Sequence, residues 1–279
     1  MSQVWIGLFG SIAIAGIAYW KQSLSGSGAV AAVFVGTILY STGSLPWFGT
    51  MIAFFVFSSL LSQWKKRNKE NMERMYEKTG RRDAGQVLAN GGLAVGMSLL
   101  HGIWPLPVFW YAFLGIMATV NADTWATEIG SLSKKSPVSI LTGRTVHPGT
   151  SGGITALGLL ATVLGSIFIG AVATILLFIH WKETISHVPF PFAHVVAINI
   201  GVTFLAGTIG CLADSLLGAT VQVMYACDAC GLEVETAMHC QKAAKKIRGF
   251  SFFSNDRVNS FSSFIGGAAA MMASFIIGA

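Results

Sequence analysis

Charged side chains are scarce in this chain: Asp, Glu, Lys and Arg make up 11% of its 279 residues, whereas soluble domains carry about 25%. Hydrophobic residues account for 53%, and the mean hydropathy is +0.63. Apolar windows recur along the whole chain and are long enough to cross a bilayer, which takes about 20 residues as a helix. The composition excludes an ordinary soluble domain and predicts a polytopic integral membrane protein.

The apolar windows predict an all-α transmembrane bundle of about eight spans, within a range of about seven to nine, that forms one membrane domain over residues 1–279. The spans are expected at 2–20, 27–44, 46–63, 84–102, 106–122, 153–180, 194–224 and 258–279. Three long hydrophilic connections separate them. They are an amphipathic loop at 64–83, a glycine-rich loop at 123–152 and a cysteine-containing basic loop at 225–257.

The distribution of basic residues predicts the orientation of the bundle. Cytoplasmic loops of membrane proteins carry an excess of Lys and Arg. If the three long connections and the short 21–26 turn are cytoplasmic, all of the 18 Lys and Arg residues except Lys182 lie inside. Both termini then face outside. Because the basic residues are divided among loops with no aromatic platform between them, nucleic acid is not an expected partner. We expect a prokaryotic plasma membrane as the location.

Several ionisable and amide side chains lie at or near the predicted membrane depth, where such groups are costly and usually face a cavity or a partner. Asp123 and Glu128 close the fifth span, and Asp214 lies inside the seventh. The other polar positions are Arg82, Gln86, Asn90, Asn255, Asp256 and Asn259. All of them lie toward the cytoplasmic side, which predicts one polar site at that interface. The alternative for Asp214 is a buried carboxylate bonded to Ser or Asn of another helix.

The stretch "TGRTVHPGTSGG" (residues 142–153) combines glycines with hydroxyl side chains just before the sixth predicted span. Gly149, Gly152 and Gly153 permit backbone conformations closed to other residues, and Thr150 and Ser151 are expected to cap the helix. A glycine-rich loop that enters a helix N-terminus is suited to binding phosphate. The named nucleotide-binding motifs are absent, and an ordinary capping turn is the alternative.

Carboxylates, a phosphate-binding loop and a basic rim are the parts that phosphoryl transfer requires, since that reaction depends on positioning and charge neutralisation. Lys134, Lys135 and Arg144 supply the positive charge near the loop. Mg²⁺ commonly binds one or two carboxylates together with substrate phosphates. We expect Asp123 and Asp214 as the leading magnesium ligands and Glu128 as the third.

Four motifs in order, "RRDAGQVLANGG", "NADTWATEIGSLSKKSPVSILTGRTVHPGTSGG", "GCLADSLLGATVQ" and "NDRVNSFSS", resemble the integral-membrane family catalogued as domain of unknown function 92. That family includes the chloroplast phytyl-phosphate kinase of tocopherol synthesis. Asp123, Ala126, Gly130, Arg144 and the 149–152 stretch are also similar, more distantly, to a pattern in CTP-dependent polyprenol kinases and cytidylyltransferases.

The resemblance implies transfer of a phosphoryl group from a nucleoside triphosphate, CTP or another, to an isoprenoid alcohol or monophosphate. It implies a metal and phosphate site at Asn121, Asp123 and Glu128. The residues implied to hold the triphosphate are Arg144, Gly149, Thr150, Ser151 and Gly152, and those implied to complete the pocket are Asp214, Asn255, Asp256 and Asn259. Lys135, Gly153, Arg82, Gln86 and Asn90 are expected to join the nucleotide-binding residues.

Cysteine is rare, and three of the four cysteines lie in "CDACGLEVETAMHC" (residues 227–240). A cytoplasmic position argues against disulfides. Cys227, Cys230, His239 and Cys240 have the right chemistry for tetrahedral Zn²⁺. Reduced free thiols and a redox-active pair are the alternatives, and the sequence does not decide among the three.

Two other functions compete with a lipid kinase. A transporter or flippase for a phosphorylated lipid or small anion would have helices broken near the midplane and polar groups reaching both faces. The short, nearly uncharged outer loops favour a one-sided site instead. A non-catalytic scaffold does not account for so many polar clusters on one face. Whether the chain forms a homo-oligomer is left open by the sequence.

Overall fold

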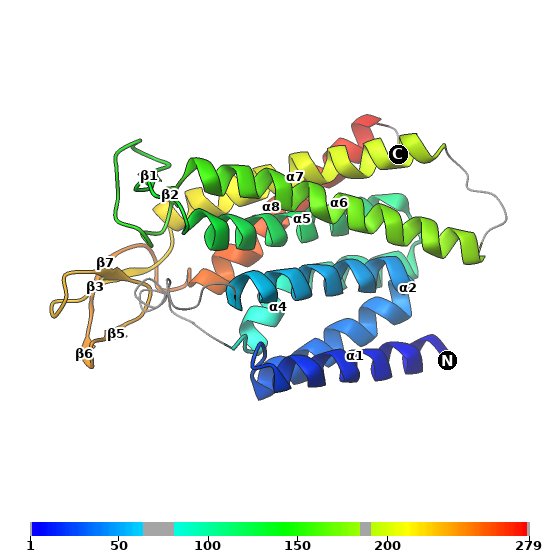
Figure 1. The fold of residues 1–279 in the computed structure, drawn as a ribbon, viewed down its shortest axis with the longest axis horizontal. Coiled ribbons are helices and arrows are strands. Elements are labelled where there is room, and N and C mark those ends of the chain that lie inside the picture. The colour runs from blue at the N-terminus through cyan, green and yellow to red at the C-terminus, as the bar shows by residue number, and fades with distance from the viewer. Residues whose placement is uncertain (1, 64–80, 185–190, 278–279) are drawn as a thin grey trace.

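The computed structural model describes residues 2–63, 81–184 and 191–277. This part of the chain contains seven helices: α1 (Ser2–Trp20), α2 (Gly26–Gln63), α4 (Ala84–Ile103), α5 (Pro107–Gly130), α6 (Ala156–Thr184), α7 (Phe192–Thr220) and α8 (Asn255–Ile277). The helices lie roughly along one direction in a bundle (Figure 1). Most of the predicted amphipathic loop, residues 64–80, lies outside the described residues.

Helix α2 contains both of the spans predicted at 27–44 and 46–63. Its backbone leaves the helical conformation at Ser44, where φ is 65°, and Pro46 follows. Proline is favoured at the start of a helix because its missing N–H has no helical partner there. The two arms of α2 run in opposite directions, as the change from darker to lighter blue in Figure 1 shows. The predicted break between the two spans is therefore present, as a sharp reversal at Ser44 that joins two helical arms.

Five of the described helices are long and apolar enough to cross a membrane: α1, α2, α6 over Ala156–Trp181, α7 and α8. Helices α4 and α5 are not among them, since polar residues interrupt their apolar sequences. Every predicted span coincides with a helix or with an arm of α2. The number of segments that cross a bilayer stays a prediction.

Helix α5 is the centre of the bundle. It packs against α2, α4, α6, α7 and α8, while α1 packs on α2 at the periphery. Every residue from Ala112 to Ala122 is buried. Near one end of α5, the rings of Trp110 and Phe113 pack against Trp47 of α2, with centroids 5.3 and 4.6 Å from the Trp47 ring. Dispersion contacts between close-packed side chains stabilise such a core even where lipid removes the hydrophobic drive for helix association.

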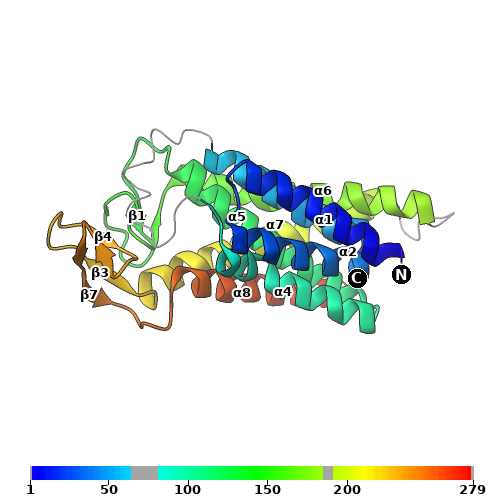
Figure 2. The same cartoon turned by 90° about the horizontal axis from the view of Figure 1, so that it is seen from below.

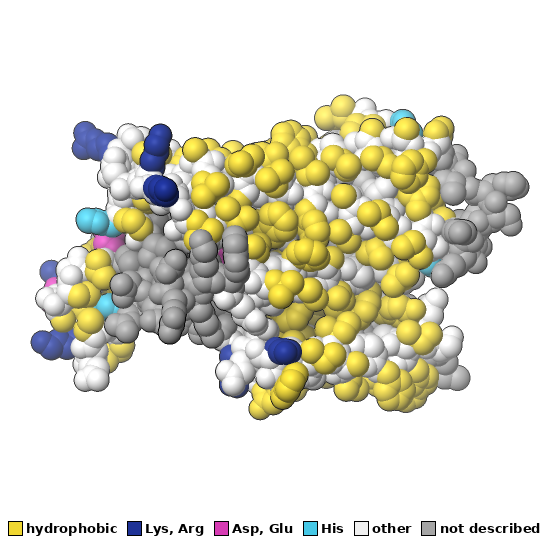
Figure 3. Space-filling model, viewed as in Figure 1, with side chains coloured by type: hydrophobic (Ala, Val, Ile, Leu, Met, Phe, Trp, Pro, Cys, Tyr) yellow, Lys and Arg dark blue, Asp and Glu magenta, His cyan; other side chains and the backbone are white. Residues whose placement is uncertain are grey.

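The two ends of the bundle differ in chemistry. One end carries both chain termini, the reversal of α2 and the α4–α5 connection, and the opposite end carries all the β-strands (Figures 1 and 2). In Figure 3, the visible Lys and Arg side chains gather toward the strand-bearing end and hydrophobic side chains cover the middle of the surface. This separation is the one that the distribution of basic residues predicted. Which end faces the cytoplasm stays a prediction.

The expectation of an all-α protein holds for the bundle but misses seven short strands in the connections. They are β1 (Val138–Ser139), β2 (Gly153–Ile154), β3 (Met224–Ala226), β4 (Glu233–Val234), β5 (Met238–His239), β6 (Lys242–Ala243) and β7 (Lys245–Arg248). The antiparallel sheets are β1–β2, β4–β3–β7 and β5–β6. Strands of two to four residues are too short to show an apolar alternation, so the sequence pattern did not reveal them.

Two predicted helix boundaries also need correction. The fifth span was expected to end at residue 122, but α5 continues to Gly130, since no glycine or proline lies between Ala122 and Gly130. The seventh was expected to reach residue 224, but α7 ends at Thr220, and Met224 begins β3. The first of these differences places Asp123 within a helix instead of at its end.

We predict that Gly115→Ala destabilises the bundle, because a Cβ there would lie 2.5 Å from both the Gly266 carbonyl oxygen and the Ala270 Cβ of α8. Overpacking of this kind costs about 1–3 kcal/mol. Gly201→Ala in α7 is the matched control, since its Cβ would meet nothing within 4 Å. Thermal unfolding in detergent should show a lower Tm for the first variant alone. Equal Tm values would contradict close α5–α8 packing.

Candidate functional site

A cleft of about 1170 Å³ opens at the strand-bearing end of the bundle, between α2, α4, α5, α6, α7, α8 and the β1–β2 loop. Most of the residues singled out by sequence line it. They are Asp123, Glu128, Asp214, Lys135, Gly149, Thr150, Ser151, Gly152, Gly153, Arg82, Gln86, Asn90, Asn255, Asp256 and Asn259. Predicted residues from segments far apart in sequence therefore line one polar cleft.

Asp123 of α5 and Asp214 of α7 face this cleft from neighbouring helices. An Asp214 carboxylate oxygen accepts a hydrogen bond of 2.8 Å from the Ser262 hydroxyl of α8. Asp123 makes no hydrogen bond to the described residues, and the charges of Asp214 and Glu235 act on it. Like charges held together in a partly buried cleft repel one another, so the arrangement favours binding of a cation.

Glu128 lines the same cleft from another side of α5. Because α5 does not unwind between Asp123 and Glu128, the two side chains leave the helix about 140° apart. Glu128 instead accepts a hydrogen bond of 2.6 Å from the Ser62 hydroxyl at the end of α2. Within the described ranges, the three predicted magnesium ligands do not form a compact group of metal-binding atoms. The structure thus groups Asp123 with Asp214 and holds Glu128 apart from them.

The glycine-rich loop lies against the end of α7. Gly149 and Gly152 have φ values of 88° and 83°, and a Cβ on Gly152 would lie 2.4 Å from the Ala219 Cβ. Two of the loop amides are used within the loop, by bonds from Thr150 N–H to the His147 carbonyl and from Gly153 N–H to the Thr150 carbonyl. The loop therefore lines the cleft, and some of its backbone N–H groups are already hydrogen-bonded within the loop.

The predicted cap of the sixth helix is wrong. Thr150 and Ser151 were expected to cap it, but β2 intervenes and α6 begins at Ala156. The side-chain oxygen of Thr155 accepts from the Gly158 N–H at 2.9 Å. The strand pairing of Gly153 with Ser139 moves the helix start past the glycines, so Thr150 and Ser151 are displaced from the helix N-terminus.

A buried chain of polar side chains connects the glycine-rich loop to the cysteine-containing loop. The Ser151 hydroxyl donates to the Gln222 amide oxygen at 3.0 Å, and the Gln222 amide nitrogen donates to a Glu235 carboxylate oxygen at 2.7 Å. Gln222 and Glu235 are 2% and 8% exposed, and both line the cleft. The sequence analysis did not assign either to the site. The one available signal was the position of Glu235 between the two halves of the cysteine motif.

Arg248 of β7 is a third residue that was not predicted from the sequence. Its guanidinium donates to the Gly218 and Ala219 carbonyls at the end of α7 and to the Ser151 carbonyl of the glycine-rich loop. The last carbonyls of a helix lack helical partners and carry the negative end of its dipole, which favours a cation there. One side chain thus fixes the loop to the end of the helix.

Arg82 reaches the cleft from the connection before α4. Its guanidinium lies 5.7 and 5.6 Å from the ring centroids of Phe54 and Phe55. Burial lowers the pKa of Arg82 to about 10, and its buried Nη1 has no hydrogen-bond partner among the residues that the structure describes. Gln86, by contrast, forms a reciprocal capping box with Asp83 at the start of α4, so its side chain already has a structural partner.

The structure keeps two predicted site residues out of the cleft. Arg144 is exposed in the β1–β2 loop and does not line the cleft. Asn121 is fully buried between α5 and α6, where its amide nitrogen donates to the Gly165 carbonyl at 2.7 Å. A polar residue inside an apolar helix can serve a contact between helices as well as a site, and the sequence alone does not separate the two roles.

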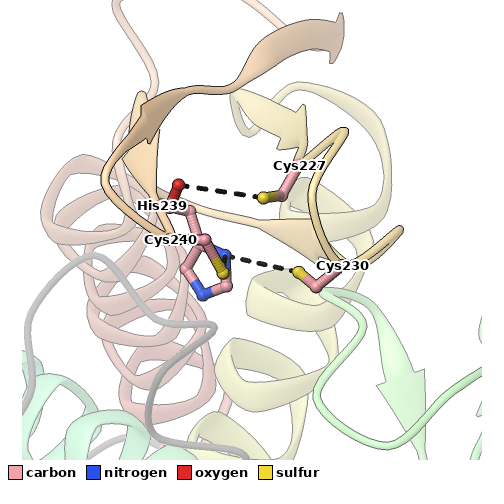
Figure 4. A group of neighbouring side chains, drawn as sticks. All are labelled: Cys227, Cys230, His239 and Cys240. Carbon is pink, nitrogen blue, oxygen red and sulfur yellow. Dashed lines mark hydrogen bonds between the residues drawn. The ribbon is translucent and has the colours of Figure 1, made fainter.

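Cys227, Cys230, His239 and Cys240 come together in the loop between α7 and α8 (Figure 4). Their potential ligand atoms all lie within 4.8 Å of one another. His239 Nδ1 lies 3.5 Å from Cys230 Sγ and 3.3 Å from Cys240 Sγ. A hydrogen bond with His239 lowers the pKa of the Cys227 thiol to about 6, which favours the thiolate that binds metals. The four predicted ligands are thus assembled in one place.

The fold and the cleft define a helical integral membrane protein with a polar site at one end. The chain belongs to the family "Integral membrane protein DUF92", whose profile matches residues 9–267. This membership confirms the resemblance seen in the four sequence motifs.

Its relatives come from a plant and an archaeon. The chain is 30% identical to Protein PGR of Arabidopsis thaliana, covering 86% of this chain and 85% of that protein. It is 30% identical to the uncharacterized membrane protein MJ0933 of Methanocaldococcus jannaschii, covering 71% and 75%. It is 26% identical to Protein VTE6, chloroplastic, of Arabidopsis thaliana, covering 71% and 56%. No solved structure matches the chain. Because the relatives include a chloroplast protein, the prokaryotic plasma membrane stays a prediction.

We predict that Arg248→Met loosens the glycine-rich loop. Methionine has no hydrogen-bond donor, so the carbonyls of Gly218, Ala219 and Ser151 lose the bonds that the guanidinium donates. Amide hydrogen exchange of the 148–153 segment should rise in this variant. Lys246→Met on the same strand is the control, since Lys246 bonds only the Ser251 hydroxyl on the surface. Unchanged exchange in Arg248→Met would show that the guanidinium does not fix the loop.

Proposed function

We propose that this protein is a membrane-embedded phosphotransferase that moves a phosphoryl group from a nucleoside triphosphate, CTP or another, to an isoprenoid alcohol or isoprenoid monophosphate. The observation that carries the proposal is the single cleft in which carboxylates, basic side chains and the glycine-rich loop meet at the end of an apolar bundle. Ligand pockets usually measure about 300–1,000 Å³. At about 1170 Å³, this cleft has room for a nucleotide and a lipid headgroup together.

The charges of the cleft suit a triphosphate and its cation. Lys21, Arg81, Arg82 and Lys135 line the rim or wall and would neutralise phosphate oxygens. The unpartnered Nη1 of Arg82 is a buried donor that a phosphate oxygen would satisfy. Arg144 does not line the cleft and is left out of the proposed site.

Asp123 and Asp214 are the residues that would hold Mg²⁺. Asp123 has no hydrogen-bond partner among the described residues and lies in the field of two other carboxylates, which is the environment that a divalent cation stabilises. When bound, the ion would supply charge neutralisation at the transferring phosphoryl group. Glu128, which accepts a hydrogen bond from the Ser62 hydroxyl, would accept a proton from the acceptor hydroxyl or orient it.

A lipid acceptor fits the position of the cleft. The cleft lies where the polar end of the bundle meets surfaces rich in exposed hydrophobic side chains, such as Leu159 and Leu160 at the start of α6 and Leu216 of α7. An isoprenoid chain would lie along these helices with its headgroup at the level of Asp123. The nucleotide would enter from the aqueous side, past the basic residues.

A transporter is the second candidate, and the helices give it less support. Helices α6 and α7 run without a break through Ala156–Thr184 and Phe192–Thr220. The one reversal within a described helix, at Ser44, lies at the end of the bundle opposite the cleft (Figure 1). Midplane helix breaks are the usual device of such transporters, and the polar site here is one-sided.

We predict that Asp123→Asn and Asp214→Asn each lower phosphorylation of a prenyl substrate by at least about a hundredfold, because each removes a charge that holds the cation in the cleft. Purified protein would be assayed with Mg²⁺, each labelled nucleoside triphosphate and a panel of prenols and prenyl phosphates. Glu233→Gln is the matched control, since Glu233 is exposed on β4 and does not line the cleft.

Tm measurements on all three variants would establish that they remain folded. Full turnover by either aspartate variant would refute the assigned roles. Lipid flipping or anion uptake in liposomes, without nucleotide consumption, would instead establish the transporter.

A further inference from the structure

The cysteine and histidine cluster in the loop between α7 and α8 is not used by the proposed phosphotransfer. We propose that Cys227, Cys230, His239 and Cys240 bind one Zn²⁺ ion, and that this ion holds Glu235 in the cleft by fixing the loop that carries it. The metal site itself does not depend on the proposed function.

The distances within the cluster are close to those of a tetrahedral zinc site. Zinc binds cysteine sulfur at about 2.3 Å and histidine nitrogen at about 2.0–2.1 Å, so neighbouring ligand atoms of a tetrahedron are about 3.5–3.8 Å apart. His239 Nδ1 lies 3.5 and 3.3 Å from the Cys230 and Cys240 sulfurs. All four ligand atoms fall within 4.8 Å. Three soft thiolates and an imidazole favour zinc over the hard cations that prefer oxygen.

The first pair of ligands is presented by a tight turn. Cys227 N–H donates to the Leu232 carbonyl at 3.0 Å, and Gly231 N–H donates back to the Cys227 carbonyl at 2.8 Å. Gly231, directly after Cys230, has φ of 71°, which favours glycine. This turn brings the two thiols of the C-x-x-C motif to one side of the loop (Figure 4).

The second pair comes from the β5–β6 hairpin. Cys240 and Gln241 form its two-residue turn, with φ of 50° and 59°. Consecutive left-handed residues normally require Asn-Gly or similar sequences, so the sequence Cys-Gln adopts this turn at a cost in free energy. The turn is what allows the adjacent His239 and Cys240 to face the same point. Metal binding would offset that cost, since backbone strain of this kind collects where function requires it.

The two pairs enclose the segment that carries Glu235. Eight residues separate Cys230 from His239 in the chain. One of them, Glu235, is 8% exposed and accepts the hydrogen bond from Gln222. The pairing of β5 with β6 and of β4 with β3 involves two residue pairs each. Such short ladders are weak, so a metal that joins both ends of the segment would determine where Glu235 lies.

The test is the metal content of the purified full-length protein. We expect about one zinc ion per chain by elemental mass spectrometry, and a loss of at least about tenfold in Cys230→Ser, which removes a ligand. Cys230→His, which supplies another zinc ligand, should retain the metal. Cys211→Ser is the control, since Cys211 is the one cysteine outside the cluster. Replacement of zinc by Co²⁺ should give the visible absorption of a tetrahedral thiolate site.

Hydrogen exchange tests the consequence for Glu235. Exchange of the 231–237 segment should rise in Cys230→Ser and stay unchanged in Cys211→Ser and Cys230→His. Wild-type protein without bound metal, or with a disulfide between Cys227 and Cys230, would overturn the zinc site. Loss of metal without any change in exchange would overturn the role in holding Glu235. Since wild-type metal content is measured first, the proposal stays testable even if a variant does not fold.

Discussion

The cost of placing polar groups in a bilayer determines the arrangement of this protein. A carboxylate or guanidinium in hydrocarbon is stable only with a partner or with access to water. Here ionisable residues of α5, α7 and α8 and of the connecting loops meet in one cleft at the polar end of the bundle. The remaining helix surfaces present hydrophobic side chains (Figure 3). Because Asp123, Glu128 and Asp214 share one open cleft, the other surfaces of these helices can remain apolar.

Helix α5 links packing to chemistry. Its middle, from Ala112 to Ala122, is buried among five other helices, and its last two turns carry Asp123 and Glu128 into the cleft. A rigid, packed helix positions side chains more accurately than a loop does. The helix also separates the two carboxylates. Asp123 lines the cleft within the electrostatic influence of Asp214, and Glu128 accepts a hydrogen bond from Ser62 of α2, so one helix provides two different environments within a single site.

A second layer of contacts holds the loops over the cleft. Arg248 joins the end of α7 to the glycine-rich loop, and the Ser151–Gln222–Glu235 chain joins that loop to the cysteine-containing one. The Gln222–Glu235 bond is buried and the others are partly buried, and a buried polar group left without its partner is costly. The loops are therefore coupled. A displacement of one loop is expected to shift the cleft-lining residues of the others.

The sequence by itself determined the class of fold, the positions of the helices and many of the residues that line the cleft. The length of an apolar segment and the presence of a charged residue within it can both be read locally from the sequence. Asp123, Asp214 and the glycine-rich loop were identified in this way. Only the tertiary structure decided that Arg144 and Asn121 lie outside the cleft, that Thr155 and not Thr150 caps α6, and that Glu235, Gln222 and Arg248 complete the site. These outcomes depend on strand pairings and contacts between segments far apart in the chain. No local pattern of residues encodes such contacts, since each depends on where the partner segment is placed by the packed helices.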